Sequence, residues 1–523
     1  MILKSFKKAL NRCFGILCIV GLAYGMTSCK NDDETANYSP FDPKQEVVVT
    51  SFTPEEGGYQ DQIVVYGRNF GNKKENVTLK IGGKEAVVVN VQWDKLYAFV
   101  PSQAFSGEVE VTVTDGEGNV KTATASKNFT YEAKVVVGTL CGYQNEHDSQ
   151  GELFGSFDVC TGFLYEGCLA FDPLYPDKLY IAYDTGSGYI AELNLETRTY
   201  SRLMSANKFQ NQRLRNIAFS QDGKYMLVST DRADNDLHST SVWIVTRNAN
   251  GTFSDSSSCQ PLVAYKQCNS VAVHPVNGEV YFNSFSNGEL FTMNLDDYLN
   301  FEPTVSNPLT GEMTSWTGYR EDNCFRELFK IQDPSYEFMV TIHPSGNYAY
   351  LTVVNRSYIL RSDYDWNKKQ FTTPYVIAGE NGIEDYTDAV GTSARLHRPY
   401  QGVFVKNEKY VEEGRDDVYD FYIADCLNFC IRSLTPDGIM RTYAGHSPST
   451  NGNIWGTEDG DPRQAARFRD VTGIAYSEAR KCFYVLDHNN RRIRSIGKES
   501  EETIIVPPVV DEETEETETP SEN

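Results

Sequence analysis

The chain has 523 residues, of which 40% are hydrophobic and 12% aromatic, with 32 Tyr against 8 Met. This length exceeds that of one ordinary domain, so several domains are expected, and the composition favours short strands and turns over helices. The formal charge is −24, and it becomes −28 when the four cations of the first twelve residues are left out. A chain with this charge is repelled by phosphate backbones and anionic lipid headgroups, which argues against nucleic acid as a partner.

Residues 1–28 have the organisation of a targeting segment. A basic start is followed by the apolar stretch FGILCIVGLAYGM, which is too short for a confident membrane span, and MTSC then ends at Cys29 after small residues. This order resembles a bacterial lipoprotein signal, which implies that residues 1–28 are removed and that Cys29 carries a lipid. The alternative is an ordinary signal peptide in which the cysteine has no role.

Residues 29–46 are expected to form a polar tether. The acidic run KNDDE follows Cys29 directly, and the polar stretch NYSPFDPKQ comes after it. An acidic run at this place resembles the export signal of Bacteroidetes surface lipoproteins, which implies a lipid-anchored protein exposed on the outer membrane. At the other end, residues 499–523 contain DEETEETETPSEN, which has no apolar content to fold around and is expected to be disordered.

Residues 47–133 alternate apolar and polar side chains in short runs such as DQIVVYG, VTLKIG and EVEVTVT, with Gly, Pro or Asn turns between the runs. This pattern predicts a small antiparallel β-sandwich. The phrases TPEEGG, GRNFG and IGGKEA, with Phe129 and Tyr131 at the end, resemble an immunoglobulin-like IPT/TIG domain. The resemblance covers the whole segment and implies a spacer without a catalytic role.

Residues 134–498 contain a strand pattern that repeats. Each unit has an apolar strand, a turn with Pro, Gly or Asp, an alternating strand, a second turn and another strand. A repeat of this length built only from strands predicts a β-propeller, because one such sheet cannot bury both of its faces alone. Six blades are expected, and the equivalent positions in them are Leu169, Ile217, Val271, Val340, Val403 and Ile474.

The last two units, with YIADCLNFCIRSL and YVLDHNNRRIRSI, resemble NHL repeats. We therefore expect an all-β protein in which an immunoglobulin-like IPT/TIG sandwich precedes a six-bladed NHL-type β-propeller. In the repeat, the phrases YVIAG (375–379) and RTYAG (441–445) form the outermost strand of a blade, whereas the sixth unit stops near Ile496 without one. KVVVGTLCG (134–142) is a phrase of the same kind, and we predict that it closes the ring by completing the sixth blade.

Few residues have the spacing of a catalytic or metal site. Nine cysteines remain after Cys13, Cys18 and Cys29 are set aside, and an odd number leaves at least one thiol unpaired if all pairing is intramolecular. Cys426 and Cys430 have CxxxC spacing, but no second cysteine pair or nearby His cluster completes a metal site. Because G-x-S-x-G, HExxH and Walker motifs are absent, we expect no enzyme, metal or cofactor; carboxylates assembled from distant blades stay open as an alternative.

Several polar residues are interpreted as turn formers. His274 and His343 lie in HP-x-x-G and HP-x-G phrases, where a turn explains them better than ligation does. Asp184, Asp425 and Asp487 recur at matched turns and are interpreted as Asx-turn formers.

A binding site is expected on the loops that connect the blades. If each blade is a four-stranded meander, these loops share one face of the ring with the turns between second and third strands. Three of them are long, 141–167, 379–397 and 445–467, and they lie at neighbouring junctions. Long loops on a rigid ring are where binding residues usually lie, so this arc is the predicted site.

Trp455 and Tyr386 are the aromatic candidates in the arc, because each lies in a polar loop where its ring can stack on a sugar. The alternative is that each ring folds back and fills its own loop. Arg232 and His238, in the turn DRADNDLHSTS of the second blade, are candidates for hydrogen bonds to a ligand, and a solvated turn is the alternative.

The order of lipoprotein signal, acidic run, IPT/TIG spacer and NHL-like propeller resembles surface lipoproteins of gut Bacteroidetes that accompany starch-utilisation-type uptake systems. The resemblance implies a non-catalytic protein that captures an oligosaccharide or polysaccharide and passes it to a TonB-dependent transporter and its associated lipoproteins. The expected partners are thus a carbohydrate ligand, these proteins, and the membrane through the N-terminal lipid. Two alternatives stay open: a lyase or hydrolase at the channel mouth, and a binder of a partner protein or of a non-sugar nutrient such as a corrinoid or siderophore.

Overall fold

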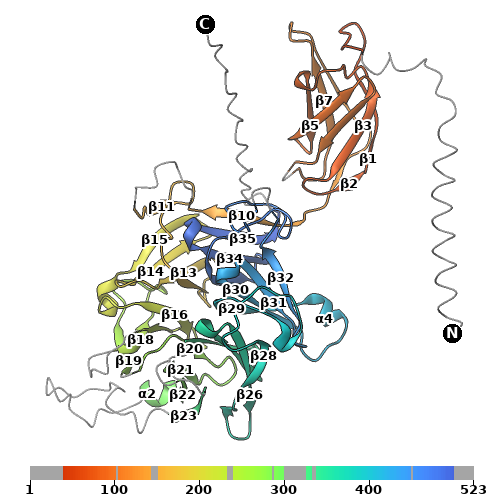
Figure 1. Ribbon diagram of the computed structural model, residues 1–523. Coiled ribbons are helices and arrows are strands. Elements are labelled where there is room, and N and C mark those ends of the chain that lie inside the picture. The colour runs from red at the N-terminus through yellow and green to blue at the C-terminus, as the bar shows by residue number, and fades with distance from the viewer. Residues whose placement is uncertain are drawn as a thin grey trace, which may run out of the picture. The chain divides into compact units, whose positions relative to one another are not determined.

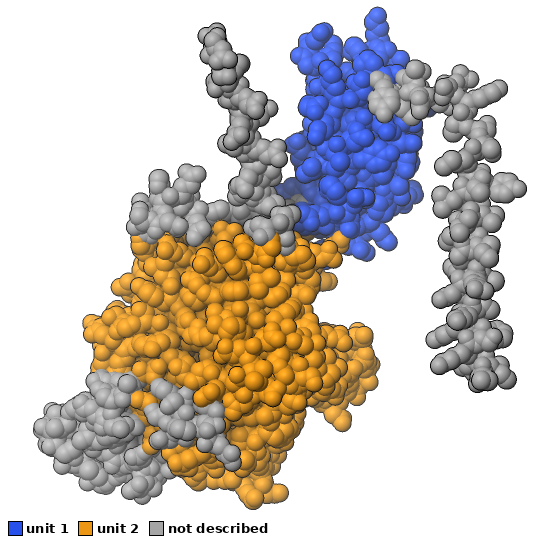
Figure 2. All heavy atoms as spheres, viewed as in Figure 1, with its two compact units in different colours: residues 1–133 blue, residues 134–523 orange. Residues whose placement is uncertain are grey.

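The computed structural model describes residues 39–101, 104–142, 151–231, 240–264, 266–284, 288–299, 326–331, 337–448 and 452–499. The chain separates into two compact units, residues 1–133 and 134–523, which are coloured separately in Figure 2. The expected signal 1–28, the lipidation site Cys29 and the acidic tail from residue 500 lie outside the described residues. Within the described ranges, no helix is both long and apolar enough to cross a membrane.

The first unit is a β-sandwich, as the alternating pattern predicts. Its main sheet has the order β1-β3-β6-β5-β4-β7-β8, and the short strands β2 and β9 pair separately. β5 has a bulge between Val88 and Asn90 and pairs with both β6 and β4, so it joins the two halves of the sandwich. The elements are β1 (Val48–Thr53), β2 (Glu56–Gly57), β3 (Gln62–Arg68), η2 (Lys74–Asn76), β4 (Val77–Ile81), β5 (Lys84–Gln92), β6 (Lys95–Phe99), β7 (Val109–Thr114), β8 (Val120–Thr124) and β9 (Thr130–Tyr131).

Apolar side chains from both halves fill the space between them. Phe52, Val65, Leu79, Leu96 and Val111 come from five different strands, and none is more than 5% exposed. Each side chain of this size contributes roughly 1.5–3 kcal/mol when it is fully buried. The alternation in the sequence therefore produces a core that belongs to the sandwich alone.

Asn69 holds the end of the expected tether against the sandwich. Its side chain is buried, and its φ of 67° lies in the left-handed region that Asn tolerates better than most residues. The side-chain oxygen accepts from the Asp42 amide at 2.8 Å, and the side-chain nitrogen donates to the carbonyls of Asp42 and Gln45 at 2.8 and 3.0 Å. Phe41 packs against the same core, so the GRNFG phrase fixes the chain from Phe41 onwards.

The second unit is a six-bladed β-propeller, as the repeat predicts (Figure 1). Each blade has four main antiparallel strands, and the innermost strands of neighbouring blades contact one another around the ring.

Blade 1 contains β12 (Gly167–Phe171), β13 (Lys178–Tyr183), β14 (Ile190–Asn194), β15 (Thr199–Met204) and the short β11 (Gly155–Ser156). Blade 2 contains β16 (Leu214–Phe219), β17 (Tyr225–Thr230), β18 (Thr240–Thr246) and β19 (Cys259–Ala264). Blade 3 contains β20 (Val271–Val273), β21 (Val280–Ser284), β22 (Glu289–Met293) and β23 (Arg326–Lys330).

Blade 4 contains β24 (Phe338–Ile342), β25 (Tyr348–Val353), β26 (Tyr358–Asp365), β28 (Tyr375–Gly379) and the short β27 (Gln370–Phe371). Blade 5 contains β29 (Pro399–Lys406), β30 (Tyr419–Asp425), β31 (Cys430–Leu434) and β32 (Met440–Gly445). Blade 6 contains β33 (Val471–Ser477), β34 (Cys482–Asp487), β35 (Arg492–Lys498) and β10 (Val135–Cys141). Short helices lie in the connections: η3 (Ala206–Phe209), α2 (Leu295–Leu299), η6 (Val354–Arg356), η7 (Gly391–Ser393), α4 (Glu408–Glu412), η8 (Cys426–Asn428) and η9 (His488–Asn490).

The alternating strand directions give the propeller two faces. We call the face that carries the connections between blades and the turns from second to third strands the loop face. Its three long connections, 142–166, 380–398 and 446–470, lie at neighbouring junctions, as predicted. The sequence pattern did not reveal the long connection between β22 and β23. The structure describes residues 294–299 of this connection, which follow β22 on the face opposite the loop face.

β10 completes the sixth blade and closes the ring, as predicted from KVVVGTLCG. It pairs antiparallel with β35, with Val137 opposite Ile496, and Figure 1 shows orange β10 beside blue β35. Val136 and Val137 are at most 2% exposed, and the backbone of Val137 also exchanges two hydrogen bonds with Gly460. The first strand of the repeat region is thus held by the last blade and by the loop that leads into it.

Polar side chains form hydrogen bonds with the backbone groups at the inner edges of the blades. An innermost strand has backbone groups with no partner in its own sheet. Gln401 of blade 5 accepts from the amides of Leu169 and Ile474 at 2.8 and 3.0 Å and donates to the Leu169 carbonyl at 2.7 Å, so it joins blades 5, 6 and 1. Asn216 of blade 2 bonds in the same way to the backbone of Val271 in blade 3. A cavity of about 220 Å³ in the channel is lined by blades 2 to 5.

Removal of the closing strand should strongly destabilise the propeller. A chain that begins at residue 132 keeps β10, whereas one that begins at residue 143 loses the buried side chains of Val136, Val137 and Leu140 and opens the edge of β35. At roughly 1.5–3 kcal/mol for each side chain, the free energy of unfolding should fall by about 4 kcal/mol or more, as measured by urea denaturation. Equal unfolding midpoints for the two chains would contradict the closure.

Candidate functional site

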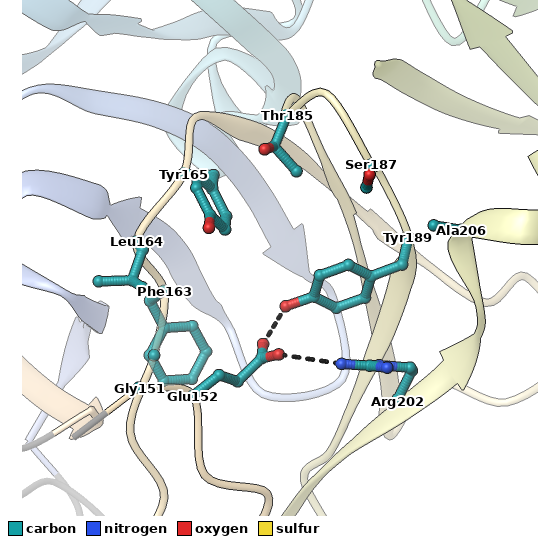
Figure 3. Close-up of a pocket in the computed structure, with 11 residues that line it drawn as sticks. Gly151, Glu152, Phe163, Leu164, Tyr165, Thr185, Ser187, Tyr189, Arg202 and Ala206 are labelled. Atoms are coloured by element: carbon teal, nitrogen blue, oxygen red, sulfur yellow. Dashed lines mark hydrogen bonds and ion pairs between the residues drawn. The ribbon is translucent and has the colours of Figure 1, made fainter. Parts of the chain in front are cut away.

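The loop face has a pocket beside blade 1, with a volume of about 410 Å³. It lies where the connection 142–166 passes over the turn from β13 to β14, so it belongs to the predicted arc (Figure 3). Its walls are formed by Gly151, Glu152, Gly162, Phe163, Leu164, Tyr165, Thr185, Ser187, Tyr189, Arg202 and Ala206.

Glu152 fastens the connection to the blade beneath it. One carboxylate oxygen accepts from the hydroxyls of Tyr189 and Tyr200, and the other lies 3.5 Å from Nη2 of Arg202. Burial raises the pKa of both phenols, and the Glu152 carboxylate raises it further, so both hydroxyls stay protonated and act as donors. Hydrogen bonds to a charged acceptor are stronger than neutral ones, which makes this wall of the pocket rigid.

The opposite walls of the pocket carry aromatic rings. Tyr165 is 42% exposed, and Figure 3 shows it facing Tyr189 across the opening. The Arg202 guanidinium lies 4.8 Å from the ring centroid of Tyr189, and its side chain is 49% exposed. Thr185 and Ser187 lie at the far end from Glu152. The pocket therefore combines ring surface, hydroxyl groups and a pair of opposite charges.

The sequence identified the connection around this pocket but none of its residues. Tyr165 lies in FLYEG, immediately before a buried strand, and in the sequence it reads as part of that strand. The available signal in the sequence was an aromatic residue within a long connection of the predicted arc. The same signal selected Trp455 and Tyr386.

Arg432 anchors the connection that precedes blade 5. Its side chain is fully buried and pairs with Asp425 at 2.9 Å and with Asp388 at 2.8 Å. The same guanidinium donates to the carbonyls of Thr387 and Arg395 at 2.9 and 3.0 Å. One strand residue therefore fixes three points of the loop.

Arg494 repeats this arrangement in blade 6. Its side chain is fully buried and pairs with Asp487 at 2.9 Å and with Asp459 at 2.5 Å. It also donates to the carbonyls of Glu458 and Arg467 at 2.8 and 2.9 Å. The two NHL-like phrases of the sequence thus carry the residues that hold the two long connections in place.

The Asx-turn interpretation of Asp184, Asp425 and Asp487 is wrong, because their carboxylates serve as ion-pair partners. Asp425 pairs with Arg432, Asp487 pairs with Arg494, and Asp184 pairs with two arginines of blade 2. All three carboxylates point into the protein, where a buried charge requires an opposite charge or several hydrogen bonds. The sequence showed the turn positions but not the direction of the side chains.

Tyr386 folds back onto blade 5. Its ring stacks on the imidazole of His446 with 3.7 Å between centroids and 5° between planes, and its hydroxyl lies 2.7 Å from that of Thr442. The ring therefore joins the connections before blades 5 and 6, which fits the alternative that it fills its own loop.

Trp455 keeps exposed surface in the connection before blade 6. Its side chain is 39% exposed, and the guanidinium of Arg469 lies 4.7 Å from its ring. The next residue, Gly456, accepts from Asn490 at 2.6 Å, which holds the loop on the turn at 488–492. Neither Trp455 nor Tyr386 lines the pocket beside blade 1, and Arg232 and His238 lie outside the described residues.

Carboxylates from several blades meet where the innermost strands begin on the loop face. Arg215, which is 3% exposed, pairs with Asp184, Asp231 and Glu337 at 3.2, 3.0 and 3.2 Å. These carboxylates come from blades 1, 2 and 4, and an arginine lies at the centre of the group.

A second arginine engages another carboxylate of this region. Arg398 forms two parallel contacts with Glu166 at 2.6 and 2.7 Å. Burial acts to raise the pKa of Glu166, but the Arg398 guanidinium outweighs it and lowers that pKa. Across the described ranges, no group of three or more His, Cys, Asp or Glu side chains is placed to hold a metal ion.

The two turn histidines have the structural role expected of them. Nδ1 of His274 accepts from amides of its own turn, and its Nε2 donates to the Gly346 carbonyl at 3.0 Å. Burial lowers the pKa of His274, which keeps the ring neutral. Nδ1 of His343 accepts from the Ser345 amide at 3.1 Å. Trp243 is 4% exposed in the core of blade 2.

Comparison with known proteins identifies relatives for both units. The IPT/TIG domain family matches residues 48–131. A candidate phosphatase from Bacteroides thetaiotaomicron has 46% sequence identity, and the match covers 88% of this chain and 99% of that one with a TM-score of 0.74. An auxiliary nutrient binding protein from the same organism has 36% identity, with 88% and 100% covered and a TM-score of 0.73. A second one, from Bacteroides ovatus, has 31% identity, with 88% and 100% covered and a TM-score of 0.61.

This chain belongs to the family of these Bacteroides proteins. Residues 134–523 make up about three quarters of the chain, so a match over 88% of it includes the IPT/TIG sandwich as well as the propeller. The similarity therefore extends over both units. A search of curated proteins finds no match to this chain.

The Arg494 anchor should be essential for the stability of the propeller. Arg494→Met leaves the carboxylates of Asp459 and Asp487 buried without a cation, which should lower the free energy of unfolding by about 3–5 kcal/mol in urea denaturation. The control is Lys481→Met, because Lys481 pairs with Glu478 in solvent, where both side chains are 61% exposed, and it should leave stability unchanged. An equally stable Arg494→Met protein would show that the pair is not an anchor.

Proposed function

We propose that this protein captures an oligosaccharide nutrient outside the cell and does not transform it. The observation that carries the proposal is the open pocket beside blade 1, because its volume of about 410 Å³ is typical of small-molecule sites and its walls combine rings with polar groups. Two members of the family are auxiliary nutrient binding proteins, which supports the same role here.

The lining of the pocket favours a sugar. A sugar ring presents an apolar C–H face and a rim of hydroxyl groups, so it needs both aromatic surface and hydrogen-bonding groups. Tyr165 and Tyr189 offer the former, and the Glu152–Arg202 pair, which has no net charge, offers the latter. A phosphate group fits less well, because the carboxylate of Glu152 lies beside the guanidinium of Arg202 and repels anions.

The arrangement of Glu152 favours binding over catalysis. A carboxyl group that acts as a general acid or base needs access to the proton that it transfers. The two oxygens of Glu152 are already engaged by Tyr189, Tyr200 and Arg202. The carboxylates near the channel are likewise engaged by Arg215 and Arg398.

We further propose that Cys29 carries a lipid and that the protein lies on the outer surface of the outer membrane, where it delivers its ligand to a TonB-dependent transporter. The support is the order of the targeting segment and the acidic run KNDDE in the sequence. These residues lie outside the described part of the chain.

Tyr165 should contribute a stacking surface to glycan binding. A glycan array identifies the ligand, and calorimetric titration of that oligosaccharide should then give an affinity about 30-fold lower for Tyr165→Ala, since loss of a binding hot spot costs about 2 kcal/mol. Tyr175→Ala is the matched control, because Tyr175 is a similarly exposed tyrosine of blade 1 at the other end of β12. Equal affinities for the two variants would remove Tyr165 from the site.

Product analysis on the same mixtures distinguishes capture from turnover. Binding without shortening of the oligosaccharide is expected. The family member with 46% identity is described as a candidate phosphatase, so release of phosphate from sugar phosphates by the native protein is measured in parallel. Turnover that is lost in Glu152→Gln would replace the binding proposal with an enzymatic one.

Trp455 should matter only for longer oligosaccharides. The pocket loop and the Trp455 loop both contact the turn at 488–492, the first at Gly142 and the second at Gly456, so an extended ligand can lie across that turn. Trp455→Ala should weaken binding of long chains by about 10-fold, equivalent to about 1.4 kcal/mol, and leave short ones unaffected. If the variant instead melts at a lower temperature with normal affinity for long chains, the indole is part of the fold and not of the site.

A further inference from the structure

Two cysteines meet at the seam where the ring closes. Cys141 is the last residue of β10, opposite Ile493 of β35, and Cys160 lies in the connection that forms the pocket. Both are 1% exposed and belong to the same core cluster. The seam therefore has one thiol on the closing strand and one on the pocket loop.

The backbone around both residues holds the two thiols together. The amide of Cys160 donates to the Ser156 carbonyl at 2.9 Å, and its thiol lies 3.8 Å from the Phe157 carbonyl. Cys141 and Cys160 lie in one buried cluster, and the nearby Cys160 thiol acts together with burial to raise the pKa of Cys141. The end of the closing strand and a tight turn of the loop therefore share this cluster.

Gly142 makes this approach feasible. Its φ is 89°, in the left-handed region, and a Cβ atom here would lie 2.4 Å from the Arg491 carbonyl oxygen and 2.8 Å from the ring of Phe163. Any larger residue would push the loop away from the blade. The glycine after Cys141 thus keeps the loop, and with it Cys160, close to the end of β10.

We propose that Cys141 and Cys160 form an intramolecular disulfide that locks the pocket loop to the closing strand. Two S–H bonds break and one S–S bond forms, and the two electrons and two protons pass to a second disulfide, which is reduced to two thiols. An exported protein meets such disulfide oxidants outside the cytoplasm. The bond ties the chain at the start of the ring to Glu152 and Phe163 of the pocket, so it preserves the shape of the binding site.

The exchange takes place before the seam closes. Both thiols are 1% exposed in the folded protein, so an external disulfide reaches them only while the chain folds. The thiolate of one cysteine then attacks the external disulfide, and the second cysteine resolves the mixed disulfide.

Peptide mapping of the full chain tests the proposal. The protein is unfolded in urea and refolded with reduced and oxidised glutathione, free thiols are alkylated, and a Glu-specific protease is added without reductant. Cleavage after Glu146, Glu152 and Glu166 places the two cysteines in separate peptides and removes Cys168 from both. Mass spectrometry should find the Cys141 and Cys160 peptides joined, with the loss of two hydrogen atoms. Recovery of both peptides alkylated, or joined to other cysteines, would overturn the proposal.

Thermal melting provides a second measurement that does not depend on ligand binding. The oxidised native protein should melt about 5 °C above the same protein with reductant, because the cross-link restricts the unfolded chain. Cys160→Ser should melt at one temperature in both conditions. Cys259→Ser, which removes a thiol that contacts the Lys208 carbonyl, should keep the full difference. A native protein whose melting temperature is the same with and without reductant would contradict the lock, whatever the fate of the variants.

Discussion

The buried contact between Arg494 and Asp459 connects three parts of the propeller that are far apart in the sequence. Arg494 lies on a strand of blade 6, and Asp459 lies on the connection that leads into that blade. The same carboxylate accepts from the amide and the hydroxyl of Thr139 on the closing strand, at 3.1 and 3.2 Å. Because a buried charge must keep its partners, the ring cannot open at the seam without also releasing the loop and exposing the arginine.

The other long connections follow the same rule with different chemistry. Each described connection of the arc places one carboxylate, Glu152, Asp388 or Asp459, against donors of the blade that it precedes. In blades 5 and 6 the donor is a buried arginine, and in blade 1 it is a pair of tyrosine hydroxyls. Because the tyrosine hydroxyls bind Glu152, the neighbouring Arg202 stays half exposed. Of these three anchors, the one at blade 1 therefore also lines the pocket.

The sequence predicted the fold better than it predicted the site, and the reason is physical. Strand alternation and the recurrence of positions such as Leu169 and Val340 reflect burial. The pattern of apolar residues that burial requires is visible within each short segment of the sequence. The role of Asp487 depends on Arg494, and that of Glu152 depends on Tyr189 and Tyr200, so local turn chemistry alone assigned the aspartates wrongly and missed the glutamate. The sequence shows Trp455 as an aromatic residue in a polar loop. That it does not line the pocket follows only from the arrangement of the blades around the ring.

The hydrogen bonds of Asn69 to the chain at Asp42 and Gln45 limit the reach of the lipid anchor proposed at Cys29. Since the chain is fixed to the sandwich from Phe41 onwards, only the segment between Cys29 and Phe41 is left to span the gap. A fully extended chain covers at most 3.3–3.6 Å per residue, so this segment spans at most about 40 Å. With a lipid on Cys29, as proposed, the sandwich is confined to a thin layer above the bilayer, at the height of the extracellular loops of neighbouring membrane proteins rather than free in the medium.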